Sequence, residues 1–69
     1  MSETVARVTE ISVRSTTSFD AAINAGIERA NETLRGVSGA WVKSQKVEIE
    51  NGKVTAYQVI LAITFVLDD

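Results

Sequence analysis

The chain has 69 residues, a formal net charge of −2 and neither cysteine nor histidine. Without cysteine it has no disulfide, iron–sulfur cluster or thiolate zinc site, and without histidine it lacks the commonest transition-metal ligand and the commonest general base. The acidic balance and the scattered lysines and arginines argue against a surface for nucleic acid or an anionic membrane.

The first half of the chain predicts a strand followed by a helix. Val5 to Val13 is rich in β-branched residues and runs into a polar cluster, as a strand runs into a turn. Thr17 or Ser18 is expected to cap the helix, and Gly36 to end it in a left-handed conformation with Arg35 in the last turn. The amphipathic stripe between them has three- and four-residue steps: Phe19, Ala22, Ile23, Gly26, Ile27, Ala30, Leu34 and Val37.

The second half predicts a long β-hairpin. Ala40 to Glu50 and Val54 to Leu67 flank Asn51-Gly52, a dipeptide typical of type I′ turns. A two-residue loop pairs Glu50 with Lys53 and fixes the register outward. The face toward the helix then pairs Val42 with Leu61, Ala40 with Ile63 and Lys46 with Tyr57. The opposite face pairs Ile49 with Val54, Val47 with Ala56, Gln45 with Gln58 and Trp41 with Ala62.

These elements predict an α+β chain of βαββ order, forming a single domain over residues 1–69. The first two strands are separated by a helix and therefore run parallel, so the third strand is expected between them in a three-stranded antiparallel sheet. The last strand is apolar on the side away from the helix as well, through Val54, Ala56, Ile60, Ala62 and Val66. One helix cannot cover both faces of a sheet, so we expect further copies of the chain to cover the second face.

The sequence offers little for catalysis, and we expect the protein not to be an enzyme. Glu48 and Glu50 share a strand face beside the turn, where charges usually keep an edge soluble. Asp68-Asp69 is a weak candidate for holding a hard cation and is more simply a solvated tail. The four glycines are dispersed, so no phosphate-binding loop is expected.

Trp41, Gln45 and Gln58 are predicted to share the sheet face opposite the helix. An indole offers a flat surface for stacking, and a primary amide offers donors and acceptors for the edge of a heterocycle. The group suits a planar-ring ligand. It equally suits a subunit contact in which Trp41 is the anchor and the glutamines bond across the interface.

The chain resembles the dodecins, small flavin-binding proteins of bacteria and archaea, over almost its whole length. The matching residues are Arg7-Val8, Glu10-Ile11, Ser18 to Ile23, Gly26-Ile27, Arg29-Ala30, Thr33-Leu34, Val42, Asn51 to Val54, Tyr57 to Val59, Phe65 and Leu67. The resemblance implies a sheet wrapped around one helix and twelve subunits in a hollow shell of tetrahedral symmetry. It also implies flavin pairs between subunits, held by a stacking Trp and a Gln on the concave sheet face.

Gln58 matches the flavin-binding Gln of the dodecins, whereas two other positions depart from the pattern. Gly39 stands where flavin-binding dodecins typically have the stacking Trp, and the one Trp of this chain, Trp41, follows two residues later. Lys46-Val47 replaces a common Arg-Gly pair. Residues two apart share a strand face, so Trp41 is expected in the same cavity, about 6.6 Å farther along the strand.

The sequence therefore predicts a cytoplasmic homo-oligomer, a dodecamer by resemblance, that binds, stores or buffers a small planar ligand. Flavin (riboflavin, FMN or FAD) is the first candidate, with Gln58, Trp41, Gln45, Gly39 and Lys46 as site positions and no protein-bound metal. The alternative is a ligand-free structural shell or a cation-binding dodecin-like protein in which Trp41 fills the flavin space. Neither a leader segment nor a stretch of transmembrane length is recognisable, and no nucleic-acid or membrane partner is expected.

Overall fold

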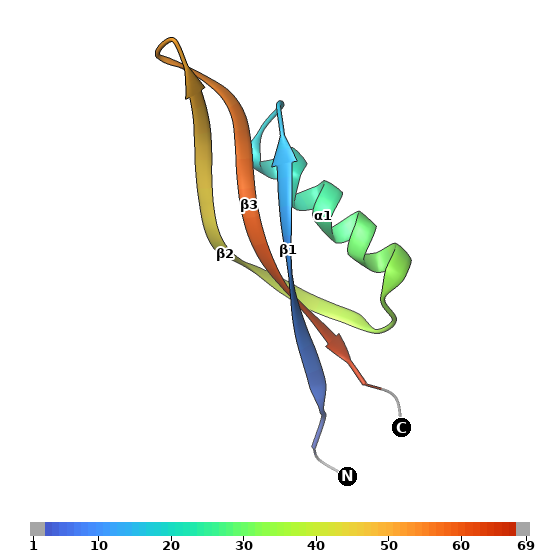
Figure 1. Cartoon of the computed structure of the whole chain (residues 1–69). Helices are drawn as coiled ribbons and strands as arrows, with labels where there is room; N and C mark the ends of the chain where they lie inside the picture. The colour runs from blue at the N-terminus through green and yellow to red at the C-terminus, as the bar shows by residue number, and fades with distance from the viewer. Residues whose placement is uncertain (1–2, 68–69) are drawn as a thin grey trace.

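The computed structural model describes residues 3–67, so the predicted cation position at the C-terminus lies outside the described part of the chain. The element order is βαββ, as predicted: β1 (Ala6–Ser15), α1 (Phe19–Thr33), β2 (Val37–Glu50) and β3 (Lys53–Val66). Figure 1 shows the helix lying obliquely across one face of a long, twisted and bent sheet. No helix within residues 3–67 is both long enough and apolar enough to span a membrane.

The sheet has the predicted strand order β1-β3-β2, and both pairings are antiparallel. The most apolar strand is therefore central. Its side chains Val59, Leu61 and Ile63 face the helix and form the buried core with Ala22 and Ala30. Alternation along the strand sends the residues between them to the other side of the sheet.

Helix α1 begins where the sequence indicates but ends earlier. Ser18 is the N-cap, and its side-chain oxygen accepts a hydrogen bond of 3.0 Å from the backbone nitrogen of Ala21. The helix ends at Thr33, since the next residue, Leu34, has extended backbone angles. The predicted end at Gly36, with Arg35 in the last turn, is therefore wrong.

Gly36 instead forms the turn into β2. Its φ is +72°, and its carbonyl accepts a hydrogen bond of 2.9 Å from the backbone nitrogen of Val66. A Cβ at this glycine would lie 2.8 Å from the carbonyl oxygen of Val66. Val37, the last residue of the predicted helix stripe, begins β2 and pairs with Phe65. Tertiary contact with β3, which the helical periodicity does not show, determines this boundary.

The hairpin turn agrees with the prediction, whereas part of the register does not. Asn51 and Gly52 have φ of 51° and 78°, and Glu50 pairs with Lys53, as a type I′ turn requires. The predicted pairs at both ends of the hairpin are confirmed: Ile49–Val54, Val42–Leu61, Trp41–Ala62 and Ala40–Ile63. Between them the register moves by one residue, because irregularities lie at Glu48/Ile49 and at Val42/Ser44.

The shift moves the middle of β2 to the opposite faces. Lys46 pairs with Gln58 instead of Tyr57, and Gln45 pairs with Val59 instead of Gln58. Val47 pairs with Tyr57 instead of Ala56. Each predicted pair in this stretch is wrong by one position, and a one-residue slip reverses the face of every side chain that it affects.

The sheet reaches well beyond the helix. The molecule measures 56 × 19 × 13 Å, with a radius of gyration of 14.5 Å, against about 11 Å for a compact domain of this length. The side away from the helix is less exposed than the sequence suggests, because Ala56 and Ala62 are fully buried within the single chain. The apolar surface exposed on this side is therefore smaller than expected, and Val54 at the hairpin tip, which is 46% exposed, is its most exposed member.

Candidate functional site

The sheet face without the helix carries polar side chains on both sides of an apolar centre. We call it the open face and define it by three cross-strand rows: Arg14–Gln58–Lys46, Ser12–Ile60–Ser44 and Glu10–Ala62–Trp41. In each row the first residue belongs to β1, the second to the central β3 and the third to β2. The rows follow from the pairing register, because directly paired residues in a sheet lie on the same face.

The row that contains Gln58 borders a shallow pocket of about 290 Å³. Ser44, Lys46, Gln58 and Ile60 line it, so it lies on the β2 side of the central strand. Its volume is at the small end of the range of ligand sites, about 300–1,000 Å³. The pocket combines an amide, an ammonium, a hydroxyl and an apolar floor, which are groups that orient a polar ring.

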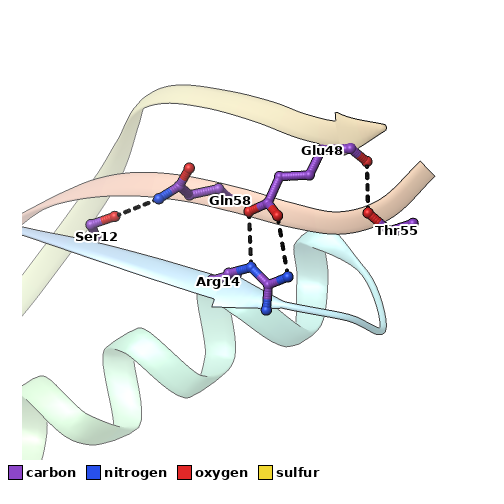
Figure 2. Close-up of polar contacts among 5 residues, drawn as sticks. All are labelled: Ser12, Arg14, Glu48, Thr55 and Gln58. Carbon is purple, nitrogen blue, oxygen red and sulfur yellow. Dashed lines mark hydrogen bonds and ion pairs between the residues drawn. The ribbon is translucent and has the colours of Figure 1, made fainter. Parts of the chain in front are cut away.

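The Gln58 amide is held from the β1 side by Ser12. Its Nε2 donates a hydrogen bond of 3.2 Å to Ser12 Oγ, and Figure 2 shows the amide oxygen on the side away from Ser12. The two residues lie on neighbouring strands one row apart, since Ser12 pairs directly with Ile60. The amide oxygen of Gln58, a hydrogen-bond acceptor, is therefore directed away from β1, while the amide nitrogen is bonded to Ser12 of the same chain.

Beside Gln58, Arg14 and Glu48 are joined across the central strand. Nε and Nη2 of Arg14 donate to the Glu48 carboxylate at 2.8 and 3.2 Å (Figure 2). The hydrogen bond from Arg14 lowers the pKa of Glu48, and the same contact raises the pKa of Arg14. The charges of this pair cancel, whereas Lys46 forms no ion pair within residues 3–67. Lys46 is therefore the cation that is available to a ligand in this row.

A second ion pair crosses the sheet near Trp41. Lys43 Nζ lies 2.8 Å from Glu10 Oε2, and this contact joins β2 to β1 over Ala62. Trp41 pairs with Ala62, and 52% of its surface is exposed in the single chain. The indole is accessible, but it lies four residues along β3 from Gln58, a separation of about 13 Å.

Besides Trp41, two further residues predicted for the site lie away from the Gln58 pocket. Gln45 pairs with Val59, whose side chain is in the helix-facing core, so Gln45 and Gln58 point to opposite sides of the sheet. Gly39 pairs with Thr64 and borders a different pocket of about 240 Å³ with Ile27, Val37, Ser38 and Ala40. Apart from Gly39 itself and its two chain neighbours, no heavy atom lies within 4 Å of the place where a Gly39 Cβ would be, so the position is open in the single chain.

Sequence reasoning missed four contributors to this face: Ser12, Arg14, Ser44 and Glu48. The alternation Glu10, Ser12, Arg14 along β1 is a signal for the first two, once β1 is aligned with β3. Ser44 and Glu48 face this side because of the register irregularities, for which the sequence gives no clear signal. No group of three or more aspartates or glutamates is arranged for metal binding within residues 3–67.

Comparisons with known proteins agree with this architecture. The family model Dodecin matches residues 5–68. A dodecin from Streptomyces coelicolor has a TM-score of 0.89 at 35% identity, covering 100% of this chain and 99% of that one. The tt0972 protein of Thermus thermophilus has a TM-score of 0.88 at 33% identity, with coverages of 97% and 98%.

A third solved structure, the dodecin from Streptomyces davaonensis, has a TM-score of 0.88 at 32% identity. The match covers 99% of this chain and 100% of that one. No curated protein matches the chain. The family match and these structures cover nearly every residue from β1 to the end of β3. The chain belongs to the dodecin family.

Proposed function

We propose that the protein is a homo-oligomeric, dodecin-like shell that binds and buffers a small planar ligand, with flavin as the first candidate. The observation that carries this proposal is the row Arg14–Gln58–Lys46 beside a pocket on the open face. Gln58 holds the position of the flavin-binding Gln that the family resemblance implies. Lys46 adds a donor beside Gln58, which suits a carbonyl oxygen at the polar edge of the ring.

The ligand site is proposed to lie between subunits. Within one chain the pocket is shallow, and Trp41 is about 13 Å along the strand from Gln58. One subunit therefore does not offer the indole and the amide to the same ring face. A second copy, placed against the open face, would supply the missing wall, and an elongated monomer with an uncovered sheet needs such a copy for stability. A closed assembly of twelve subunits is the form that the family resemblance implies.

The proposed mechanism is sequestration without catalysis. The ring would stack on Trp41, bond through its polar edge to Gln58 and be shielded from water by the neighbouring subunit. Lys46 would donate a hydrogen bond to a carbonyl oxygen of the same edge. Gln45 is left out of this mechanism because its register position lies on the helix side.

The second candidate is a shell that does not bind flavin, and the open space at Gly39 favours it. The family's stacking position has no side chain here, while an indole stands two residues away. In this case Trp41 would occupy the space that flavin takes up in other dodecins, and the assembly would be structural or would bind another ligand.

The two candidates differ in the response to added flavin. The protein is titrated with riboflavin and FMN while flavin fluorescence is followed, and the mass of the native particle is measured in parallel. Saturable quenching in an oligomeric particle is the expected result. An oligomer that leaves the fluorescence of both flavins unchanged would support the structural shell and contradict ligand buffering.

A further inference from the structure

The Gln58 amide lies between neighbours that differ in what they can donate and accept. On the β1 side, Ser12 Oγ accepts a hydrogen bond of 3.2 Å from Gln58 Nε2. On the β2 side, Lys46 is the direct cross-strand partner of Gln58 and lines the same pocket. An ammonium only donates hydrogen bonds, whereas a hydroxyl can donate or accept. The two sides therefore favour opposite ends of the amide.

Lys46, as a cation on the β2 side, would set the direction of the Gln58 amide, and Ser12 would complete it. A serine hydroxyl by itself would accept from the amide nitrogen or donate to the amide oxygen with equal ease. A cation on the β2 side favours the oxygen there and leaves the nitrogen for Ser12. Figure 2 shows this arrangement, with the nitrogen bonded to Ser12 and the oxygen on the far side of the amide.

The Arg14–Glu48 ion pair engages the cation that is the direct sheet partner of Gln58 on the β1 side. Arg14 pairs with Gln58 in the sheet, and a free guanidinium there would attract the amide oxygen toward β1. Instead, two of its nitrogens are bonded to the Glu48 carboxylate at 2.8 and 3.2 Å. Arg14 is thereby neutralised and oriented away from Gln58, as Figure 2 shows.

We propose that Ser12 is a positioning residue that, together with Lys46, holds the Gln58 amide with its carbonyl oxygen toward the pocket. This inference rests on the proposed function and adds the chemistry of the ligand edge. The pocket then presents an acceptor, Gln58 Oε1, beside a donor, Lys46 Nζ. The complementary edge is an N–H next to a carbonyl, as in the imide of a pyrimidinedione ring. A ring with acceptor atoms only along that edge would meet the amide oxygen unfavourably.

The test compares two uncharged probes, lumiflavin and 3-methyllumiflavin, which differ only in whether the imide nitrogen carries a hydrogen or a methyl group. Both are titrated by fluorescence into the oligomeric protein and into Ser12→Ala and Ser12→Thr. The original protein is expected to bind lumiflavin more tightly than the methylated probe. The alanine variant should bind lumiflavin about three- to tenfold more weakly, the worth of one net hydrogen bond. It should bind the methylated probe with little change, so that the affinity ratio falls.

Ser12→Thr restores the hydroxyl on a residue suited to a strand, and it should restore the original ratio. If Ser12 had only a structural role, the alanine variant would bind both probes more weakly by the same factor. An unchanged ratio would therefore overturn the positioning role while leaving the ligand site intact. If the original protein binds neither probe, the proposed function itself fails, and this inference fails with it.

Discussion

Arg14 on β1 and Glu48 on β2 form a two-point ion pair over a strand that belongs to neither of them. Strands β1 and β2 are both edge strands, separated by β3, so their backbones are about 9.5 Å apart. Only long side chains close that gap. Ala56, the partner of Glu48, is fully buried on this face in spite of having no helix above it. Small residues on β3 and long charged ones on its neighbours therefore cover part of the sheet within a single chain.

The ion pair predicts an acid-sensitive contribution to stability. The pKa of Glu48 is lowered by the Arg14 hydrogen bond, so the folded state binds a proton at Glu48 less readily than the unfolded chain does. The stabilisation is fully present above the unfolded pKa of about 4.3 and is lost as the pH falls through the lower folded value. Glu48→Gln should thus lower the melting temperature near neutral pH and have little effect in strong acid.

The matched control is Glu28→Gln, which changes an exposed glutamate of α1 that has no ion pair within residues 3–67. Melting temperatures of the three proteins are recorded across the acid range. Parallel curves for Glu48→Gln and the original protein, with the same difference at every pH, would contradict the assigned role of the Glu48 charge.

The hairpin turn is expected to tolerate no β-branched residue at its second position. Gly52 has φ of +78° and open space around its Cβ position, so the backbone angle, and not crowding, restricts it. Gly52→Val should cost more than about 1 kcal/mol through backbone strain alone. Asn51→Asp is the control, since Asp-Gly also favours a type I′ turn. Melting temperatures measure both, and an unchanged value for Gly52→Val would show that the turn can adopt another form.

The turn and the ends of the hairpin could be predicted because their signals are local. Asn51-Gly52 determines its own φ angles, and the pairs Ile49–Val54 and Trp41–Ala62 follow from counting outward. The middle of β2 could not be predicted, because the register shift depends on a bulge. Thr55 has no partner in the pairing, and its hydroxyl bonds to the Glu48 carbonyl at 3.3 Å.

That bulge also decides which residues form the candidate site. It places Lys46 beside Gln58 and turns Gln45 toward the helix. A prediction that assumes regular alternation along β2 therefore puts Gln45, and not Lys46, next to Gln58. Gln58 itself was predictable, because it lies on the central strand, whose alternation the core fixes. Ser12 could not be predicted as a site residue, because its place depends on the register between β1 and β3. That register is a long-range pairing, and no turn connects the two strands to fix it.

The open face is expected to be a subunit contact that does not accept an unpaired charge at its centre. Ile60 lies in the middle row, between Ser12 and Ser44. Ile60→Lys should cost several kcal/mol if the ammonium is buried without a partner, and it should reduce the mass of the native particle. Asn24→Lys, at an exposed position of α1 on the other side of the sheet, should leave the assembly intact. A mass of one subunit for the original protein would contradict the oligomer.

Trp41 is expected to stack on the ligand. Its surface is 52% exposed in the single chain, so an indole face is available to a ring. Trp41→Ala should weaken FMN binding by about 1–3 kcal/mol and reduce the quenching of bound flavin. The affinity is measured by fluorescence titration. Stronger binding by Trp41→Ala would instead mean that the indole fills the flavin space, as the second candidate function requires.

The most direct measurement compares two glutamines of the same hairpin. FMN is titrated into the original protein, Gln58→Ala and Gln45→Ala, and dissociation constants are obtained from flavin fluorescence. Gln58 borders the pocket on the open face, whereas Gln45 pairs with core residue Val59 on the helix side. We predict that Gln58→Ala weakens FMN binding about fivefold or more, by losing hydrogen bonds at the ring edge, and that Gln45→Ala changes it little. Equal affinity of all three proteins for FMN, or a loss at Gln45 alone, would contradict a ligand site built on Gln58.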